Sequence, residues 1–148
     1  TAILKSIWKG RLEKISNNNL FYDVAHNYEG IKAMLNTINV LYPDKEKAGL
    51  FCIKSDKNIF AICKLLKNNF KKLILCSDKD GYLVKASDLL SIMNEKNIEC
   101  FSVESVDDGV SLLNEYDNPN YINLVFGSHY VASEVYSSIE KYFDRTYN

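Results

Sequence analysis

Short apolar runs alternate with segments of helical periodicity from residue 20 onward. Continuous apolar runs at 49–53 and 73–76 are typical of strands buried in a sheet, and further strands are expected at 20–22, 98–103 and 121–126. Apolar residues recur at helical spacing at 31–42, 57–70, 85–97, 105–116 and 131–142. Strict alternation of strands and helices predicts a mostly parallel sheet with helices on both faces. We therefore expect an α/β fold, a three-layer α/β/α Rossmann-like domain.

An antiparallel hairpin is expected before this array. Residues 10–15 and the run at 20–22 flank three asparagines at 17–19, which favour a turn. Ser105 stands where an N-cap would begin the fourth helix. The length of 148 residues suits one domain, so we assign residues 1–148 to a single domain with the hairpin near its N-terminus.

Composition excludes several classes of function. The net charge of −1 provides no field to attract nucleic acid or an anionic membrane, and no apolar stretch is long enough for a membrane-spanning helix. The first ten residues lack the apolar run of a signal peptide. The 4 cysteines form no C-x-x-C pair and only 2 histidines occur, so no metal site is expected. We expect a cytoplasmic protein, from a reducing compartment, without nucleic-acid or membrane partners.

Three loops follow strands and are the places where a parallel sheet binds ligands. The first loop carries Asp23, His26 and Asn27 beside a helix N-terminus. The imidazole of His26 suits an oxyanion, the carboxylate of Asp23 suits ribose hydroxyls, and the helix N-terminus suits an anion. Position alone equally permits Asn27 to cap the helix and His26 to be a surface residue.

The second and third loops supply a cation and a hydroxyl. Lys57, in the second loop, would hold a carboxylate or phosphate as a point charge, unless Asp56 caps the helix and Lys57 is solvated. In the third loop, Gly127 lets the backbone approach a ligand and Ser128 offers a hydroxyl to a carboxylate. The alternative is a glycine turn in which Ser128 caps the last helix.

Two further features bear on phosphate chemistry. Neither G-x-x-x-x-G-K-[ST] nor G-x-G-x-x-G occurs in the sequence, so the chain is not expected to hydrolyse ATP unaided. Before the hairpin stand Trp8 and Arg11. Trp8 either joins the core or covers a domain junction, and Arg11 either forms a surface ion pair or binds phosphate with two hydrogen bonds.

These motifs, in this order, resemble those of the folylpolyglutamate and dihydrofolate synthases. That family has W-x-G-R-x-E, D-x-A-H-N, D-K and G-S-x-Y segments, which here are Trp8–Glu13, Asp23–Asn27, Asp56–Lys57 and Gly127–Tyr130. The family belongs with the Mur peptidoglycan ligases, which share this C-terminal domain. The sequence departs from the pattern at Lys9 and Tyr28, where the family often has proline. For an arginine frequent after the middle strand the nearest counterpart is Lys85, whose role is left open.

The resemblance implies a C-terminal ligase domain whose N-terminal ATPase domain is absent from this chain. That partner domain would hold most of ATP and Mg²⁺ and would move the γ-phosphate onto a carboxylate of folate or dihydropteroate. The amine of L-glutamate would then attack the acyl phosphate and form an amide. Catalysis would act by positioning and charge neutralisation, and the isolated domain is expected to be inactive.

The resemblance also assigns residues by matched motif. The residues matched to the nucleotide are Arg11, Asp23 and Asn27, with Asp23 at the ribose and Asn27 ordering the loop. The residues matched to the carboxylate of glutamate are Lys57 and Ser128. His26 would be the catalytic residue, near the phosphates or the incoming amino acid.

Two other functions remain open from the sequence. One is the same domain from a Mur-type peptide ligase, although the W-x-G-R-x-E segment argues against it. The other is a non-catalytic Rossmann-like interaction module, which would have no use for Arg11, His26 or Lys57.

Overall fold

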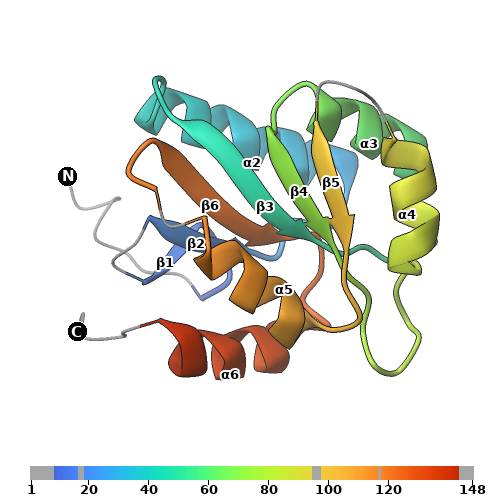
Figure 1. Ribbon diagram of the computed structural model, residues 1–148. Helices are drawn as coiled ribbons and strands as arrows, with labels where there is room; N and C mark the ends of the chain where they lie inside the picture. Colours follow the sequence, from blue (N-terminus) through green and yellow to red (C-terminus); the bar gives the residue numbers. More distant parts are fainter. Residues whose placement is uncertain (1–8, 17–18, 95–97, 117, 144–148) are drawn as a thin grey trace.

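The computed structural model describes residues 9–16, 19–94, 98–116 and 118–143, which form one sheet with helices on both faces (Figure 1). The elements are, in chain order, β1 (Glu13–Ser16), β2 (Leu20–Asp23), α2 (Tyr28–Leu41), β3 (Glu46–Phe51), α3 (Ile59–Lys67), β4 (Lys72–Leu75), α4 (Ala86–Met93), β5 (Glu99–Ser102), α5 (Val106–Asn114), β6 (Tyr121–Phe126) and α6 (Ala132–Tyr142). Trp8 lies outside the described residues, so its placement stays a prediction.

The sheet has six strands in the order β1-β2-β6-β3-β4-β5. β1 and β2 pair as an antiparallel hairpin, and every other neighbouring pair is parallel. The predicted α/β fold with an N-terminal hairpin is therefore confirmed. β6 lies between β2 and β3, so that Phe126 is opposite Asp23 on one side and opposite Phe51 on the other.

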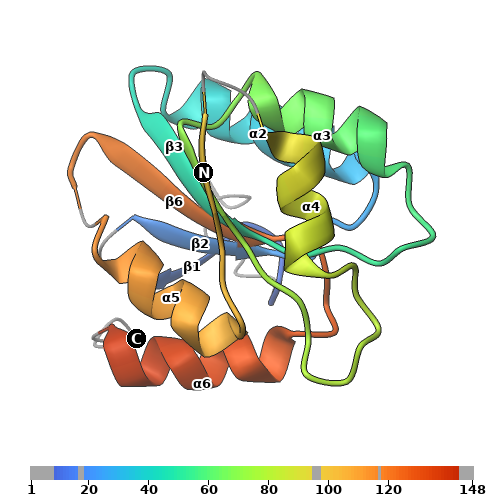
Figure 2. The same cartoon turned by 45° about the vertical axis from the view of Figure 1, so that its right-hand side comes forward.

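Two hydrophobic cores hold the layers together. Helices α2, α3 and α4 cover one face of the sheet, and α5 and α6 cover the other (Figures 1 and 2). The first core includes Ile31, Leu35, Ile62, Leu66 and Leu89, and the second includes Val106, Val110, Leu113, Val135 and Ile139. Successive residues of β6 alternate between them, since Leu124 joins the first and Val125 the second. Burial on both faces explains the apolar character of β3, β4 and β6, whereas the edge strand β5 is largely exposed.

Local capping decides where two helices begin. Ser105 caps α5 as predicted, because its side chain accepts a hydrogen bond from the Asp108 N–H at 3.1 Å. The helix expected over 57–70 spans only Ile59–Lys67, with Asn58 as its N-cap. The alternative in which Asp56 caps this helix is wrong, because Asn58 stands directly before the first helical residue and its amide oxygen accepts from the Ala61 N–H.

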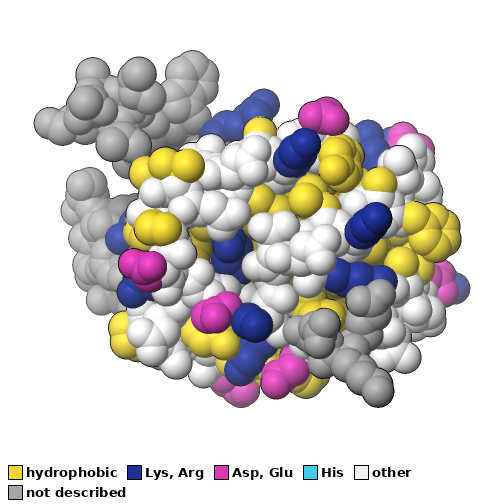
Figure 3. All heavy atoms as spheres, turned by 90° about the horizontal axis from the view of Figure 1, so that it is seen from above, with side chains coloured by type: hydrophobic (Ala, Val, Ile, Leu, Met, Phe, Trp, Pro, Cys, Tyr) yellow, Lys and Arg dark blue, Asp and Glu magenta, His cyan; other side chains and the backbone are white. Residues whose placement is uncertain are grey.

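The surface shows no gathering of one charge over α2 and α3. Figure 3 shows this side with basic side chains spread among acidic and apolar ones, in keeping with a net charge of −1. The apolar side chains of Val40 and Phe60 reach solvent here. Within the described residues, no helix combines the length and the apolar character needed to cross a membrane.

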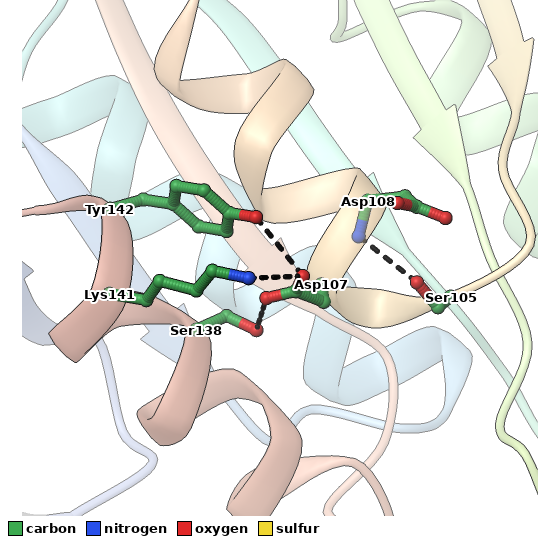
Figure 4. Close-up of polar contacts among 6 residues, drawn as sticks. All are labelled: Ser105, Asp107, Asp108, Ser138, Lys141 and Tyr142. Atoms are coloured by element: carbon green, nitrogen blue, oxygen red, sulfur yellow. Dashed lines mark hydrogen bonds and ion pairs between the residues drawn. The ribbon is translucent and has the colours of Figure 1, made fainter.

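Polar contacts centred on Asp107 join the two helices of the second face (Figure 4). The carboxylate of Asp107, at the start of α5, accepts hydrogen bonds from the hydroxyls of Ser138 and Tyr142 at 3.0 and 3.1 Å. The ammonium of Lys141 lies 3.2 Å from the same carboxylate. All three donors come from α6, so Asp107 links the first turn of α5 to the C-terminal half of α6.

Candidate functional site

The loops after β2, β3 and β6 meet at one edge of the sheet. These strands are neighbours and run parallel, and their last residues Asp23, Phe126 and Phe51 are in register. Their carboxyl ends therefore open side by side, as ligand sites of open α/β sheets do. The predicted convergence of the three loops is what the strand order produces.

A cavity of about 120 Å³ lies where the loops meet. Its lining residues are His26, Lys54, Lys57, Gly127, Ser128, His129 and Tyr130. The structure thus brings the predicted residues His26, Lys57 and Ser128 together from three different loops. A space of this size suits one small polar group of a ligand, such as a carboxylate.

Two lysines give the cavity its charge. The ammonium groups of Lys54 and Lys57 lie 3.9 and 3.7 Å from the carboxylate of Asp56. The side chain of Asp56 is 58% exposed, so both ion pairs are solvated and weak. The anion of a ligand entering the cavity would therefore compete with Asp56 at little cost.

The Ser128 loop has a backbone that only glycine accommodates. Gly127 has φ +111°, and a Cβ atom there would lie 1.9 Å from the carbonyl oxygen of Cys52. Ser128 is buried, and its Oγ accepts a hydrogen bond from the Tyr130 N–H at 3.0 Å. The alternative in which Ser128 caps the last helix is wrong, because the N-cap of α6 is Val131 and has no side-chain hydrogen bond. Among the hydrogen bonds of the described residues the Ser128 hydroxyl acts only as an acceptor, so its proton can donate to a ligand.

Aromatic rings form a continuous row beside the cavity. His26 and His129 meet edge to face at 6.3 Å, His129 stacks on Tyr130 at 4.6 Å, and Tyr130 stacks on Tyr82 at 5.8 Å between ring centroids. The Nδ1 of His26 lies 3.1 Å from the carbonyl oxygen of Val24. Since a carbonyl only accepts, this contact favours the proton on Nδ1 and leaves Nε2 of the neutral ring as an acceptor.

Arg11 and Asp23 line a second hollow, of about 250 Å³, together with residues of α2 from Gly30 to Thr37. Asp23 is 6% exposed, and its carboxylate accepts from the N–H groups of Leu12 and Ala25 at 3.0 and 2.7 Å. Burial raises the pKa of Asp23 above its ordinary value, against the lowering effect of these two donors and of Arg11. Asp23 therefore ties the hairpin to the first loop, and its contact with a ribose stays a prediction.

Asn27 and Lys85 both stand at helix N-termini. The side-chain oxygen of Asn27 accepts from the Gly30 N–H at 2.8 Å and caps α2, which is the structural alternative left open by the sequence. Lys85 is the N-cap residue of α4 and makes no side-chain capping bond. It lines a third hollow of about 460 Å³ at the ends of β4 and β5, together with Asp78 and Glu104. Lys85 is therefore not among the residues lining the cavity of Lys57.

Comparison with known families places the chain. The family description that matches residues 10–129 is that of the Mur ligase, glutamate ligase domain. The chain belongs to this family. No curated protein matches the sequence.

Solved structures share the fold of this Mur ligase domain. Escherichia coli FolC in complex with DHPP and ADP matches with a TM-score of 0.80 and 20% identity, over 94% of this chain and 33% of that chain. Bifunctional folylpolyglutamate synthase/dihydrofolate synthase from Yersinia pestis, complexed with AMPPNP and Mn ion, matches with a TM-score of 0.77 and 18% identity, over 90% of this chain and 32% of that chain. Mycobacterium tuberculosis folylpolyglutamate synthase complexed with ADP matches with a TM-score of 0.68 and 19% identity, over 89% of this chain and 31% of that chain. The chain spans about a third of the length of these proteins.

Sequence reasoning missed part of the site in this Mur ligase domain. Lys54, His129 and Tyr130 line the cavity but were not singled out, although all three lie in the two loops chosen from the strand ends. Tyr82 reaches the row from the β4–α4 loop, and no local pattern marks it. The predicted residues also separate into two groups, with Arg11 and Asp23 in one hollow and Lys57 and Ser128 in the other.

Proposed function

We propose that this Mur ligase domain is the C-terminal part of an ATP-dependent ligase that adds L-glutamate to folate or dihydropteroate through an acyl phosphate. The observation that supports it most is the cavity in which His26, Lys54, Lys57 and Ser128 converge from three loops. Two cations and a hydroxyl donor in a small cavity suit a carboxylate. The W-x-G-R-x-E segment favours the folate branch over a peptide ligase.

Each group in the cavity has a role in this proposal. Lys57, assisted by Lys54, neutralises the carboxylate of glutamate, and the Ser128 hydroxyl donates to one of its oxygens. His26 presents Nε2 toward the amine that attacks the acyl carbon. The carbon–nitrogen bond forms as the bond between the acyl carbon and the phosphate oxygen breaks, inorganic phosphate leaves, and the proton of the amine passes to Nε2 of His26. The chain's contribution is orientation of the amine and exclusion of water, which would otherwise hydrolyse the acyl phosphate.

The nucleotide would lie on the other side of the first loop. Arg11 would pair with its phosphates, Asp23 with its ribose, and Asn27 would keep the loop ordered by capping α2. Among the described residues no three side chains of His, Cys, Asp or Glu cluster as ligands for a metal ion. The proposal accordingly assigns Mg²⁺ and most of ATP to an N-terminal ATPase domain of the same protein.

The cysteines support a cytoplasmic location for the ligase. All four are free thiols, and Cys52, Cys63 and Cys76 are buried. Free thiols in these positions agree with a reducing compartment.

A ligation assay on the full-length protein tests the proposal. We expect ATP-dependent use of L-glutamate with dihydropteroate or a reduced folate as acceptor. Use of L-alanine or diaminopimelate in place of L-glutamate would assign the protein to the Mur peptide ligases instead. The interaction module would be favoured by two results together. The full-length protein would ligate no amino acid, and the variants Arg11→Ala, His26→Ala and Lys57→Ala would behave as the wild type in binding its partner.

The Lys57→Ala variant tests the assignment within the cavity. We expect the KM for glutamate to rise about thirtyfold, the value of a charge-assisted hydrogen bond of about 2 kcal/mol, with little change in the KM for ATP. Lys64→Ala, on the exposed side of α3, is the matched control for loss of one positive charge. Equal effects of the two variants on the KM for glutamate would contradict the assignment.

A further inference from the structure

The buried carboxylate of Glu13 ends the W-x-G-R-x-E segment and has no role in the proposed function. Glu13 is 8% exposed, and its Oε1 accepts from the Gly10 N–H at 3.1 Å and from the Tyr136 hydroxyl at 2.6 Å. A carboxylate buried in this way is tolerated only when its hydrogen bonds are satisfied. Glu13 therefore fixes both the turn at Gly10, next to Arg11, and a side chain from α6.

Tyr136 leads from Glu13 to a second buried tyrosine. Its ring meets the ring of Tyr22 edge to face, with centroids 5.6 Å apart and an interplanar angle of 84°. Tyr22 is opposite Glu13 in the β1–β2 hairpin and is fully buried. Burial, with smaller contributions from Cys52 and Tyr136, raises the pKa of Tyr22 well above its ordinary value. The hydroxyl of Tyr22 therefore remains a donor throughout the physiological pH range.

That hydroxyl reaches the site. It donates to the backbone carbonyl of Ser128 at 3.0 Å, from the residue whose side chain lines the cavity. Two hydrogen bonds thus hold Ser128 in place: its backbone carbonyl accepts from the Tyr22 hydroxyl, and its side-chain oxygen accepts from the Tyr130 N–H. The Gly10 carbonyl accepts from the Val24 N–H at 2.7 Å, so the same network also holds the loop of His26.

We propose that Glu13, Tyr136 and Tyr22 form a positioning relay that holds the Ser128 loop in the geometry that binds the carboxylate of the incoming amino acid, and that joins this loop to the turn carrying Arg11. The inference rests on the proposed function for the identity of that amino acid. The three residues touch no substrate, and their effect passes through Ser128. Binding at the Arg11 turn and binding at the cavity would be coupled through this chain of contacts.

The Tyr22→Phe variant of the full-length protein tests the relay, since it removes the hydroxyl and keeps the ring. We expect the KM for L-glutamate to rise about fivefold to tenfold, the value of one hydrogen bond, with kcat and the KM for ATP nearly unchanged. Tyr136→Phe and Glu13→Ala should give smaller rises of the same kind. Glu13→Gln should keep the wild-type KM for L-glutamate, because the amide oxygen of the glutamine can still accept hydrogen bonds from the Gly10 N–H and the Tyr136 hydroxyl.

The matched control is Tyr142→Phe. Tyr142 lies on the same helix as Tyr136, and its hydroxyl donates to Asp107 at 3.1 Å, away from the three loops. The substitution removes this hydroxyl and keeps the ring. The KM of this variant for glutamate should equal the wild-type value, even where its thermal stability falls. A KM for glutamate within twofold of wild type in Tyr22→Phe, or equal rises in the two variants, would overturn the relay.

Amide hydrogen exchange separates the relay from the proposed function. In Tyr22→Phe we expect faster exchange of the amides at 128–131, and no such change in Tyr142→Phe. If the wild-type protein ligates no glutamate but this difference in exchange is seen, the proposed function fails and the relay stands. Unchanged exchange at 128–131 in Tyr22→Phe refutes the relay whatever the protein ligates.

Discussion

At the scale of single residues, Gly127 is the position that tolerates a side chain least. Its φ of +111° and the 1.9 Å approach of a Cβ to the Cys52 carbonyl combine backbone strain with a clash against main chain that cannot move aside. We expect Gly127→Ala to lower the free energy of unfolding by more than about 3 kcal/mol, measured by urea denaturation.

Gly81 is the control for this substitution. It also has a positive φ, of +80°, but a Cβ there would meet nothing within 4 Å. Gly81→Ala should cost only the conformational penalty, about 1 kcal/mol. Similar losses in the two variants would show that the contact with Cys52 is not what restricts position 127.

At the scale of elements, the contacts of Asp107 hold α5 and α6 together (Figure 4). Against desolvation, the hydrogen bonds from Ser138, Lys141 and Tyr142 keep the pKa of Asp107 below its ordinary value of 3.8. Asp107→Asn removes the charge and weakens these bonds. Because the carboxylate is 43% exposed, we expect a loss of only about 1 kcal/mol at neutral pH, measured by thermal unfolding.

The pH dependence of this effect follows from the sign of the shift. A lowered pKa in the folded state stabilises the protein fully above the unfolded value of 3.8, and this contribution disappears as the pH falls through the lower folded value. Wild type and Asp107→Asn should therefore converge in stability below pH 3.8. Asp108→Asn, one residue along the same first turn, removes an equal charge from the helix N-terminus, and an equal loss in that variant would contradict the link between the helices.

At the scale of the whole molecule, this Mur ligase domain spans about a third of the chains it resembles. If most nucleotide contacts lie on the remaining part, the isolated chain should bind ATP with a Kd of about 1 mM, equivalent to about −4 kcal/mol. Isothermal titration calorimetry measures this directly, with Arg11→Ala as the variant expected to weaken it further. A micromolar Kd for the isolated chain would contradict a nucleotide site shared between domains.

The elements and their caps were predictable because their signals are local. Buried parallel strands need continuous apolar runs, so β6 was predicted at its observed bounds, Tyr121–Phe126. The start of α5 was predicted from Ser105 alone, because an N-cap side chain needs only the N–H of the residue three positions later, here Asp108. The alternative of a cap by Asp56 was wrong because two residues of similar capping ability, Asp56 and Asn58, stand close together, and only the path of the chain decides which of them caps α3.

The sequence alone determined the alternation of strands and helices and the three loops able to carry ligand groups, since both depend on neighbours along the chain. Only the tertiary structure placed β6 between β2 and β3 and so brought Ser128 beside His26 and Lys57. Only it paired Tyr22 with Ser128, 106 residues apart, and Glu13 with Tyr136, 123 apart. Such pairs leave no local pattern, because which side chains meet depends on the order in which the strands assemble.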